Sequence, residues 1–396
     1  MQRLIALNIL RKTISDESFT SLLMRKELEK LEKVQRPFVT NIVQGVLKNY
    51  ELLEYNVNLY VRKTSLTNKL ILMMALYERY FLKEKEYAVN NSYVELSKTK
   101  YDKSFINATL RNIRELKYSD NEWINVSLPE WLYKLIKKQY PDDYRTVIEN
   151  YHSVHKTYYR LNPNKTDFDY LKDKYDIEIM ENNVFISKQN LINTDDFNNG
   201  FFYIQDINAA KLTSVLKLKE DYTLLDVCSA PGSKLFNTLE LLKDSNTFSN
   251  DLNSTRLELI KKKALILGYK NINFLNCDGR YLNSKLNMKF DVIMMDVPCS
   301  GLGVIGRKPD IKFHIKPENL DELQNIGYEI LNNCSKLLKE DGQILYSTCT
   351  INRKENEKQI EKFIKNNPEF KIIEEKTIIE SYGDLFYYCL LSRVEY

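Results

Sequence analysis

The chain has 396 residues, with 58 Lys and Arg against 54 Asp and Glu, which gives a formal net charge of +4. This length supports two or three domains with substantial cores. No stretch approaches the roughly 18 consecutive apolar residues of a membrane span, and the opening residues lack a signal-peptide core. The six Cys include no C-x-x-C pair and are joined by only three His, which argues against a zinc site or a disulfide framework. We therefore expect a reduced, cytoplasmic protein without membrane contact or bound metal.

The first 140 residues are predicted to be helical. Apolar residues such as Phe38, Ile42 and Val46 recur at spacings of three and four, the period of an amphipathic helix. Residues 57–63 are predicted to form a turn. Helices are expected at residues 5–12, 22–31, 37–48, 66–81, 85–98, 103–116 and 129–140.

Positive charge is concentrated in the same part of the chain. Residues 1–150 hold 25 Lys and Arg against 19 Asp and Glu, a net of +6, and the remaining 246 residues hold 33 against 35, a net of −2. Such a surplus on a small helical domain favours contact with a polyanion such as RNA. The stretch 36–47, RPFVTNIVQGVL, resembles a NusB-like RNA-binding domain. The alternative is a helical bundle that contributes stability or docks a partner.

Residues 141–200 are predicted to form a small α/β connector that includes the sequence YRLNP at 159–163. Aromatic side chains in this region could stack on splayed RNA bases, although core packing is the more common use of any one of them. Residues 202–206 are interpreted as the start of the catalytic sheet, which opens the predicted domain 201–396.

A strand at residues 223–228, a tight loop at 229–234 and a helix at 235–243 are predicted next. This order is typical of the nucleotide-binding corner of a doubly wound sheet. The loop holds one Gly, and neither the G-x-G-x-x-G nor the Walker pattern is present. An adenosine ligand without phosphates is therefore favoured over a dinucleotide, and the alternative is an ordinary βαβ turn without a ligand.

Two carboxylates follow the next predicted strands. The strand at 247–249 leads to Asp251, which is placed to accept hydrogen bonds from the hydroxyls of a ribose. The strand at 272–276 leads to Asp278, whose carboxylate could meet the exocyclic amine of an adenine.

Two Cys residues each follow an apolar run that is typical of a buried parallel strand. Cys299 follows the run 290–295 and the carboxylate Asp296, and Cys349 follows the run 343–346. Ligands gather at the carboxyl ends of such strands. Two thiols and a carboxylate there could form a site for covalent catalysis on an electrophilic base such as cytosine, whereas the alternative is a pair of buried structural thiols.

Cytosine chemistry requires these residue types. Attack of a thiolate on carbon 6 would convert carbon 5 into an enamine-like nucleophile that can take a methyl group. At a pKa of ~8.5 only about 3% of a thiol is ionised at neutral pH, so the site must supply positive potential or a base. Asp296 could hold or deliver the proton at N3 of the base, and the second thiol could assist the loss of the carbon 5 proton.

Six strings between Asp226 and Ile360 together resemble the Sun/NOL/NOP family of RNA cytosine-5 methyltransferases, in particular the Sun/RsmB-type ribosomal-RNA members with an N-terminal NusB-like domain. The strings are DVCSAPGSK, NDLNSTR, NCDGR, FDVIMMDVPCSGLGV, KPDIKF and ILYSTCTINRKENE. Gly306 stands where the family commonly has Arg and Phe313 where it commonly has Trp, which leaves the shape of the RNA channel around Arg307 and Phe313 open.

The resemblance implies S-adenosyl-L-methionine as the cofactor, Cys349 as the nucleophile and Cys299 as the thiol that assists product release. It also implies a set of cofactor-binding residues: Cys228, Ser229, Ala230, Pro231, Gly232, Ser233, Lys234, Asp251, Arg256, Asp278 and Asp296.

The resulting prediction is an α/β Rossmann-like methyltransferase domain at 201–396, preceded by the all-α NusB-like domain 1–140 and the connector 141–200. We expect a monomer that methylates carbon 5 of a cytosine in 16S ribosomal RNA. A transfer RNA or 23S ribosomal RNA remains an alternative substrate. Another class of function is an RNA-binding assembly or antitermination factor with an inactive methyltransferase domain. The intact set of Asp296, Cys299 and Cys349 argues against that class.

Overall fold

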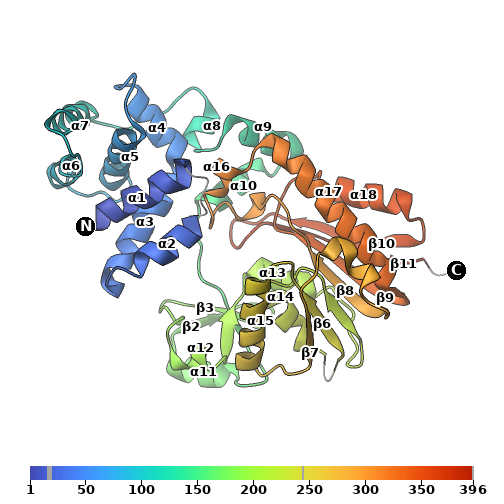
Figure 1. Cartoon of the computed structure of the whole chain (residues 1–396). Coiled ribbons are helices and arrows are strands. Elements are labelled where there is room, and N and C mark those ends of the chain that lie inside the picture. Colours follow the sequence, from blue (N-terminus) through green and yellow to red (C-terminus); the bar gives the residue numbers. More distant parts are fainter. Residues whose placement is uncertain (16–19, 243–244, 395–396) are drawn as a thin grey trace. The chain divides into compact units, whose positions relative to one another are not determined.

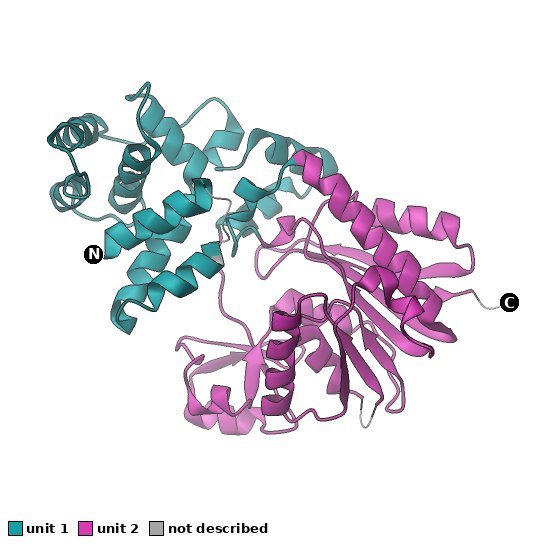
Figure 2. Ribbon diagram, in the orientation of Figure 1, with its two compact units in different colours: residues 1–152, 305–316 teal, residues 153–304, 317–396 magenta. Residues whose placement is uncertain are grey.

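The computed structural model describes residues 1–15, 20–242 and 245–394 (Figure 1). The chain forms two compact units (Figure 2). The helical unit contains Met1–His152 together with Ile305–Lys316, and the sheet unit contains Ser153–Val304 together with Pro317–Tyr396. The connector residues thus lie in the same unit as the large sheet, and we call residues 305–316, which join the helical unit, the inserted segment. The boundaries expected at residues 140 and 200 stay a prediction.

The helical unit contains a helix at each of the seven ranges predicted for it, with shifted ends. Its helices are α1 Gln2–Ser15, α2 Thr20–Leu28, α3 Arg36–Lys48, α4 Tyr50–Asn58, α5 Leu66–Tyr80, α6 Glu86–Val94, α7 Lys100–Asn112, α8 Glu122–Asn125, α9 Glu130–Gln139, α10 Tyr144–His152 and α16 Ile311–His314. The sequence argument missed α4, α8 and α10. All three helices are short; α4 and α10 are rich in Tyr and Asn, which are mediocre helix formers, so their buried contacts rather than local propensity favour them. Among the described residues, no helix has the length and apolar character needed to cross a membrane.

The conspicuous residues of the NusB-like stretch have packing roles in α3. A Cβ added at Gly45 would lie 1.9 Å from Cζ of Tyr77 on α5, so only glycine allows this approach of the two helices. The Tyr77 hydroxyl donates a hydrogen bond of 2.9 Å to Oδ1 of Asn41. Gly45 and Asn41 therefore fix the contact between α3 and α5.

The inserted segment is held in the helical unit by buried polar contacts and by an aromatic ring. Asp310 Oδ2 accepts a hydrogen bond from the backbone nitrogen of Thr20, and Lys312 Nζ lies 2.6 Å from Glu51 Oε2. Phe313 packs against the helical core, with its ring 4.9 Å from the ring of Tyr50 in an edge-on arrangement. The Phe313 ring is therefore part of the core of the helical unit.

The sheet unit is built on a seven-stranded, mostly parallel sheet of order β10-β11-β9-β8-β5-β6-β7. Its strands are β5 Leu224–Asp226, β6 Thr247–Asn250, β7 Ile272–Leu275, β8 Phe290–Asp296, β9 Leu338–Thr348, β10 Phe370–Ile378 and β11 Phe386–Arg393. The five strands β5 to β9 pair in parallel, and β11 pairs antiparallel with both β9 and β10. From β5 the chain builds β6 and β7 on one side and then β8 and β9 on the other. This reversal places a topological switch point between β5 and β8, where ligands bind in such sheets.

Helices cover both faces of this sheet, as side-chain alternation along β8 requires. Val292 and Met294 pack in the same core as α13 Ile207–Thr213, α14 Ser233–Leu239 and α15 Ser254–Leu267. Ile293 and Met295 pack on the other face, with α17 Pro317–Cys334 and α18 Glu357–Asn366. The Rossmann-like prediction is confirmed. The helix predicted at 235–243 ends at Leu239, and residue 243 lies outside the described residues.

The connector forms an antiparallel four-stranded sheet of order β2-β3-β1-β4. Its elements are β1 Tyr159–Leu161, α11 Phe168–Lys174, β2 Ile177–Ile179, β3 Val184–Ser187, α12 Asp195–Asn198 and β4 Phe202–Ile204. Because β4 pairs with β1, the interpretation of residues 202–206 as the start of the catalytic sheet is wrong. The reason is an aromatic core, in which the rings of Tyr159, Phe185 and Phe202 contact one another. Arg160 of β1 ties this sheet to the C-terminal end of α14 through a two-bond ion pair with Glu240.

Candidate active site

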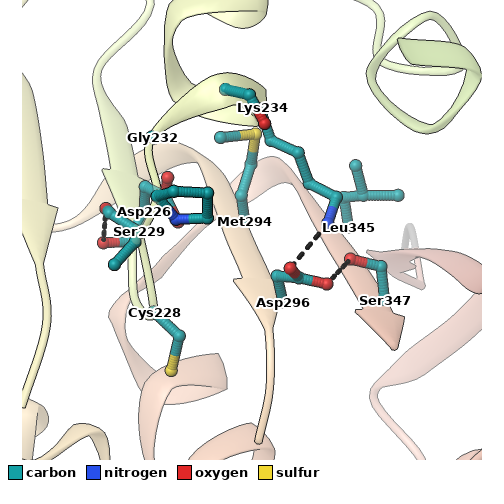
Figure 3. A pocket seen from close by; sticks show the side chains of 12 residues that line it. Asp226, Cys228, Ser229, Gly232, Lys234, Met294, Asp296, Leu345 and Ser347 are labelled. Atoms are coloured by element: carbon teal, nitrogen blue, oxygen red, sulfur yellow. Dashed lines mark hydrogen bonds and ion pairs between the residues drawn. The ribbon is translucent and has the colours of Figure 1, made fainter. Parts of the chain in front are cut away.

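A pocket opens where β5, β8 and β9 end (Figure 3). Eight of the predicted cofactor-binding residues line it: Cys228, Ser229, Ala230, Pro231, Gly232, Ser233, Lys234 and Asp296. Asp226, Met294, Leu345 and Ser347 complete the lining. Asp251, Arg256, Asp278, Cys299 and Cys349 are not part of this lining.

The single glycine of the loop between β5 and α14 is required by the backbone. Gly232 has a φ of 94°, in the left-handed region, and its nitrogen donates a hydrogen bond of 2.6 Å to the carbonyl of Ser229. A Cβ at this position would also lie 2.8 Å from the ring of Phe236. Any other residue would strain the turn that forms one wall of the pocket.

Asp251 and Arg256 form hydrogen bonds with the backbone of Ala230, which is part of this wall. The buried Asp251 carboxylate accepts hydrogen bonds from the backbone nitrogens of Ala230, at 3.1 Å, and Asn253, at 2.9 Å. Arg256 Nη2 donates to the carbonyl of Ala230 at 2.9 Å. The two side chains therefore hold both polar groups of the Ala230 backbone, and each Asp251 oxygen keeps capacity for a further donor.

The Asp278 carboxylate forms an ion pair with Arg280. It accepts hydrogen bonds from Nε and Nη2 of Arg280 at 3.0 and 2.6 Å, and from the Arg280 backbone nitrogen. The hydrogen bonds from the Arg280 side chain lower the pKa of Asp278. The adenine contact expected of Asp278 stays a prediction, and it would have to compete with this ion pair.

Lys234, Asp296 and Ser347 form a connected polar group at the pocket (Figure 3). Lys234 Nζ lies 2.5 Å from Oδ2 of Asp296, and the Ser347 hydroxyl donates to Oδ1 at 3.0 Å. The ammonium also lies over the ring of Phe386. Burial acts to lower the pKa of Lys234, but the charge of Asp296, the hydrogen bond to Asp296 and the charge of Cys349 together raise it. Lys234 is therefore a cation at neutral pH.

The two predicted catalytic thiols lie next to each other. Cys299 and Cys349 follow neighbouring parallel strands, in which Asp296 of β8 pairs with Ser347 of β9. Their sulfur atoms are 3.4 Å apart, within hydrogen-bonding distance. The structure thus brings together the pair of thiols that the sequence placed on separate loops 50 residues apart.

The charges around the two thiols differ. The hydrogen bond with Cys349 raises the pKa of Cys299 well above its ordinary value, and burial and the charges of Glu355 and Asp296 act in the same direction. Cys299 is therefore a neutral thiol at rest, and the charge of Lys234 acts on Cys349.

Several residues of this region were missed by the sequence argument. Asp226 and Ser347 are polar residues at the ends of buried strands, so the rule that identified Asp296 could have found them. Burial raises the pKa of Asp226 to about 7. Met294 and Leu345 carry no signal that separates them from core residues. Within the described residues, no group of three or more His, Cys, Asp or Glu side chains is arranged to hold a metal ion.

Two family profiles match the chain. The family described as "16S rRNA methyltransferase RsmB/F" matches residues 213–383, and the NusB family matches residues 1–115. The "Probable ribosomal RNA small subunit methyltransferase B" of Bacillus subtilis (strain 168) is 31% identical over 396 residues, covering 93% of this chain and 89% of the relative. The "Ribosomal RNA small subunit methyltransferase B" of Photorhabdus laumondii subsp. laumondii is 25% identical and covers 99% of this chain and 98% of the relative.

Solved structures share the fold. The "Crystal Structure of PH0851" has a TM-score of 0.81 at 21% identity and covers 99% of both chains. "The crystal structure of NSun6 from Pyrococcus horikoshii with SFG" has a TM-score of 0.62 at 17% identity, covering 68% of this chain and 99% of the other. The resemblance inferred from the six strings and the NusB-like stretch is confirmed: the chain belongs to the RsmB/F family of 16S rRNA methyltransferases, with a NusB-family domain at its N-terminus.

Proposed function

We propose that this chain transfers a methyl group from S-adenosylmethionine to carbon 5 of a cytosine in RNA, with 16S ribosomal RNA as the substrate. The reaction includes a transient covalent bond between Cys349 Sγ and carbon 6 of the base. The observation that carries this proposal is the 3.4 Å separation of the Cys299 and Cys349 sulfurs, together with the Lys234–Asp296 ion pair. The names of the relatives support the choice of RNA.

The pocket lining suits the cofactor. The turn at Gly232 leaves one wall made of backbone and small side chains, and Asp251, at the end of β6, has acceptor capacity for ribose hydroxyls. The NSun6 structure with SFG, an analogue of S-adenosylmethionine, supports this ligand. S-adenosylmethionine would supply the methyl group as an electrophilic sulfonium. Cys228, Ser229 and Lys234 form the remaining wall of the proposed cofactor pocket.

Lys234 supplies the positive potential that the attack requires. Its side chain is 15% exposed and its ammonium is ion-paired, so its charge acts in a partly desolvated site, where it is screened less than in water. It favours the Cys349 thiolate, which attacks carbon 6 while carbon 5 gains nucleophilic character. In this mechanism the Lys234–Asp296 pair supplies the proton that N3 takes up as charge develops there, and recovers it later.

Cys299 then removes the proton from carbon 5. Bonding of Cys349 to carbon 6 turns its sulfur into an uncharged thioether, which removes the largest cause of the raised pKa of Cys299. Cys299 can then lose its proton to solvent and accept the one from carbon 5. The double bond between carbons 5 and 6 re-forms as the Cys349–carbon 6 bond breaks. Cys349 leaves as a thiolate, Cys299 is again a thiol, and one proton has been released overall.

Bisulfite sequencing tests both the activity and the choice of RNA. We expect deletion of the gene to abolish protection of a single cytosine in 16S ribosomal RNA, and complementation with the natural chain, but not with Cys349→Ala, to restore it. Loss of protection in transfer RNA or 23S ribosomal RNA would correct the substrate and keep the chemistry. Unchanged protection in all three RNAs would favour an assembly factor without methyltransferase activity.

A further inference from the structure

Two adjacent residues at the start of α18 each hold the loop of one thiol. Glu355 and Asn356 are 2% and 0% exposed, and neither is part of the pocket lining. Their side chains bind different loops, Glu355 the loop that carries Cys299 and Asn356 the loop that carries Cys349.

Glu355 fixes the residue that follows Cys299. Its Oε2 accepts a hydrogen bond of 2.8 Å from the backbone nitrogen of Ser300, and its Oε1 accepts one of 2.7 Å from the Ser300 hydroxyl. Asn352 Nδ2 also donates to Oε1, at 2.9 Å. One carboxylate thus holds the backbone and the side chain of Ser300 at the same time.

Asn356 fixes both neighbours of Cys349. Its Oδ1 accepts a hydrogen bond of 2.6 Å from the Thr348 hydroxyl, and its Nδ2 donates one of 2.9 Å to the carbonyl of Thr350. Asn356 stands at the N-cap of α18, where an Asn side chain normally caps the helix. Here the side chain makes no capping hydrogen bond and is turned to the thiol loop instead.

A direct hydrogen bond joins the loop of Cys299 to the loop of Cys349. The Ser300 and Thr350 hydroxyls are 2.7 Å apart, and both side chains are buried. Ser300 gives its proton to Glu355, so Thr350 must be the donor to Ser300 Oγ. The loop that follows Cys299 is therefore fixed relative to the loop that contains Cys349 by a continuous chain of hydrogen bonds.

We propose that Glu355 and Asn356 are positioning residues that set the separation and orientation of the two thiols. The inference rests on the proposed function, in which the Cys299 sulfur must reach the carbon 5 proton while Cys349 is bonded to carbon 6. Displacements of about 1 Å are enough to slow such chemistry by around 10²-fold. Burial of a carboxylate or an amide costs free energy unless all of its polar atoms are hydrogen-bonded, so an apolar side chain would fill the same space at a lower cost.

Disulfide formation between Cys299 and Cys349 reports their geometry independently of methylation, because a disulfide tolerates only a narrow range of Cβ positions. Incubation with oxidised glutathione converts the two thiols to a disulfide and releases two molecules of reduced glutathione. The rate can be followed by mass spectrometry of the peptides that contain the two residues. Both variants also change the charge near the thiols, and the exchange rate depends on the fraction of thiolate. After each rate is corrected for the thiolate fraction, taken from its pH profile, we expect Glu355→Gln and Asn356→Asp to slow this reaction at least about tenfold.

Methylation should fall in parallel, with kcat lower by about 10–100-fold and with the KM for RNA and the affinity for S-adenosylmethionine unchanged. Glu361→Gln, an exposed position on the same helix, is the matched control and should leave both rates as they are. Thr350→Ser keeps the donor to Ser300 and should resemble the natural chain, whereas Thr350→Val keeps the shape but loses the donor and should slow both reactions. This pair carries the test if Glu355→Gln fails to fold.

A folded Glu355→Gln or Thr350→Val variant whose corrected disulfide rate equals that of the natural chain would overturn the positioning role of Glu355 and Asn356, whatever happens to kcat. If the natural chain forms the disulfide rapidly but methylates no RNA and forms no RNA adduct, the proposed function fails. The inference about the thiol geometry would then still be decided by the disulfide rates of the variants.

Discussion

The loops that carry Cys299 and Cys349 begin alike and differ in their electrostatics. Each follows one of two neighbouring parallel strands, and the sulfur atoms lie 3.4 Å apart. The charge of Lys234 acts on Cys349, and the charges of Glu355 and Asp296 act on Cys299. The proposed mechanism gives these two chemically identical groups different tasks, which depend on charged side chains from other elements. The position of a Cys at a strand end therefore predicts a site, and we propose that its charged neighbours determine its role.

The chain also continues differently after the two thiols. After Cys349 it enters α18 in the same unit, whereas after Cys299 it passes Gly303 and then joins the helical unit as the inserted segment. Gly303 donates a hydrogen bond of 2.9 Å to the carbonyl of Cys349, and a Cβ there would lie 2.1 Å from the carbonyl oxygen of Leu385. The loop of Cys299 is therefore held close to Cys349 just before the chain leaves the sheet unit.

Replacing each thiol in turn should give the largest effects and the sharpest contrast. Cys349→Ala removes the attacking atom, so methyl transfer should fall by at least about 10⁴-fold and no adduct should form. Cys299→Ala leaves attack and methyl transfer possible but removes the base for the carbon 5 proton. Enzyme covalently bound to RNA should then accumulate, as a slowly migrating band on a denaturing gel with labelled RNA.

The opposite pattern, with a trapped band for Cys349→Ala and none for Cys299→Ala, would exchange the two roles. Retained methylation without a band for either variant would exclude the covalent mechanism.

Lys234→Met should remove much of the difference between the two thiols. Without the cation, less of Cys349 is ionised at neutral pH and the charge at N3 is less well compensated, so kcat should fall by about 10²–10³-fold. Alkylation of Cys349 by iodoacetamide should slow at neutral pH and recover at high pH. Lys262→Met, at an exposed position of α15, is the control. Unchanged alkylation in Lys234→Met would show that the electrostatic contrast does not come from this residue.

Asp251→Ala should act on the cofactor and spare the thiols. We expect a loss of about 1.5–3 kcal/mol in S-adenosylmethionine binding, the range for hydrogen bonds to a charged group, because both the ribose contact and the support of Ala230 are removed. Asp278→Ala should cost less, since its carboxylate is already held by Arg280. Calorimetry measures both affinities, and the disulfide rate of Cys299 and Cys349 should stay unchanged. Equal affinities of Asp251→Ala and the natural chain would remove Asp251 from the cofactor site.

Residues close in sequence to a strand end could be predicted, and residues that act across long sequence separations could not. Asp296, Cys299 and Cys349 were predicted as site residues because each follows an apolar run typical of a buried strand, and ligands gather at the carboxyl ends of such strands. Glu355 was missed because its partner Ser300 is 55 residues away and nothing in the local pattern indicates the bond.

The same holds for the fold. The parallel strands β5 to β8 were predicted nearly to the residue, whereas β10 and β11 were not predicted. The stretch KPDIKF was recognised as a family string, but its place in the helical unit depends on contacts such as that between Thr20 and Asp310, which are 290 residues apart. In the sequence, Lys312 cannot be told from a surface lysine. Its burial is made possible by the ion pair with Glu51.

Lys312→Met should separate the anchoring of the inserted segment from the positioning of the thiols. Its Nζ is bound to Glu51 Oε2 and to the carbonyl of Ser127, and removing one partner of a buried pair destabilises a protein by about 3–5 kcal/mol. Chemical denaturation should show this loss. Because Glu355 and Asn356 still hold the thiol loops, kcat of the folded variant and the disulfide rate should change less than about threefold.

The pH dependence of that loss identifies its cause. Burial raises the pKa of Glu51, while the charge of Lys312 and its hydrogen bond act to lower it. Without Lys312 the folded state should bind a proton at Glu51 more tightly than the unfolded state does. The destabilisation should then be small at acidic pH and grow as the pH rises past the unfolded pKa of Glu51. The double variant Lys312→Met/Glu51→Met should recover most of the stability and lose this pH dependence. A kcat that falls as steeply in Lys312→Met as in Glu355→Gln would mean that the helical unit, through the inserted segment, also positions Cys299.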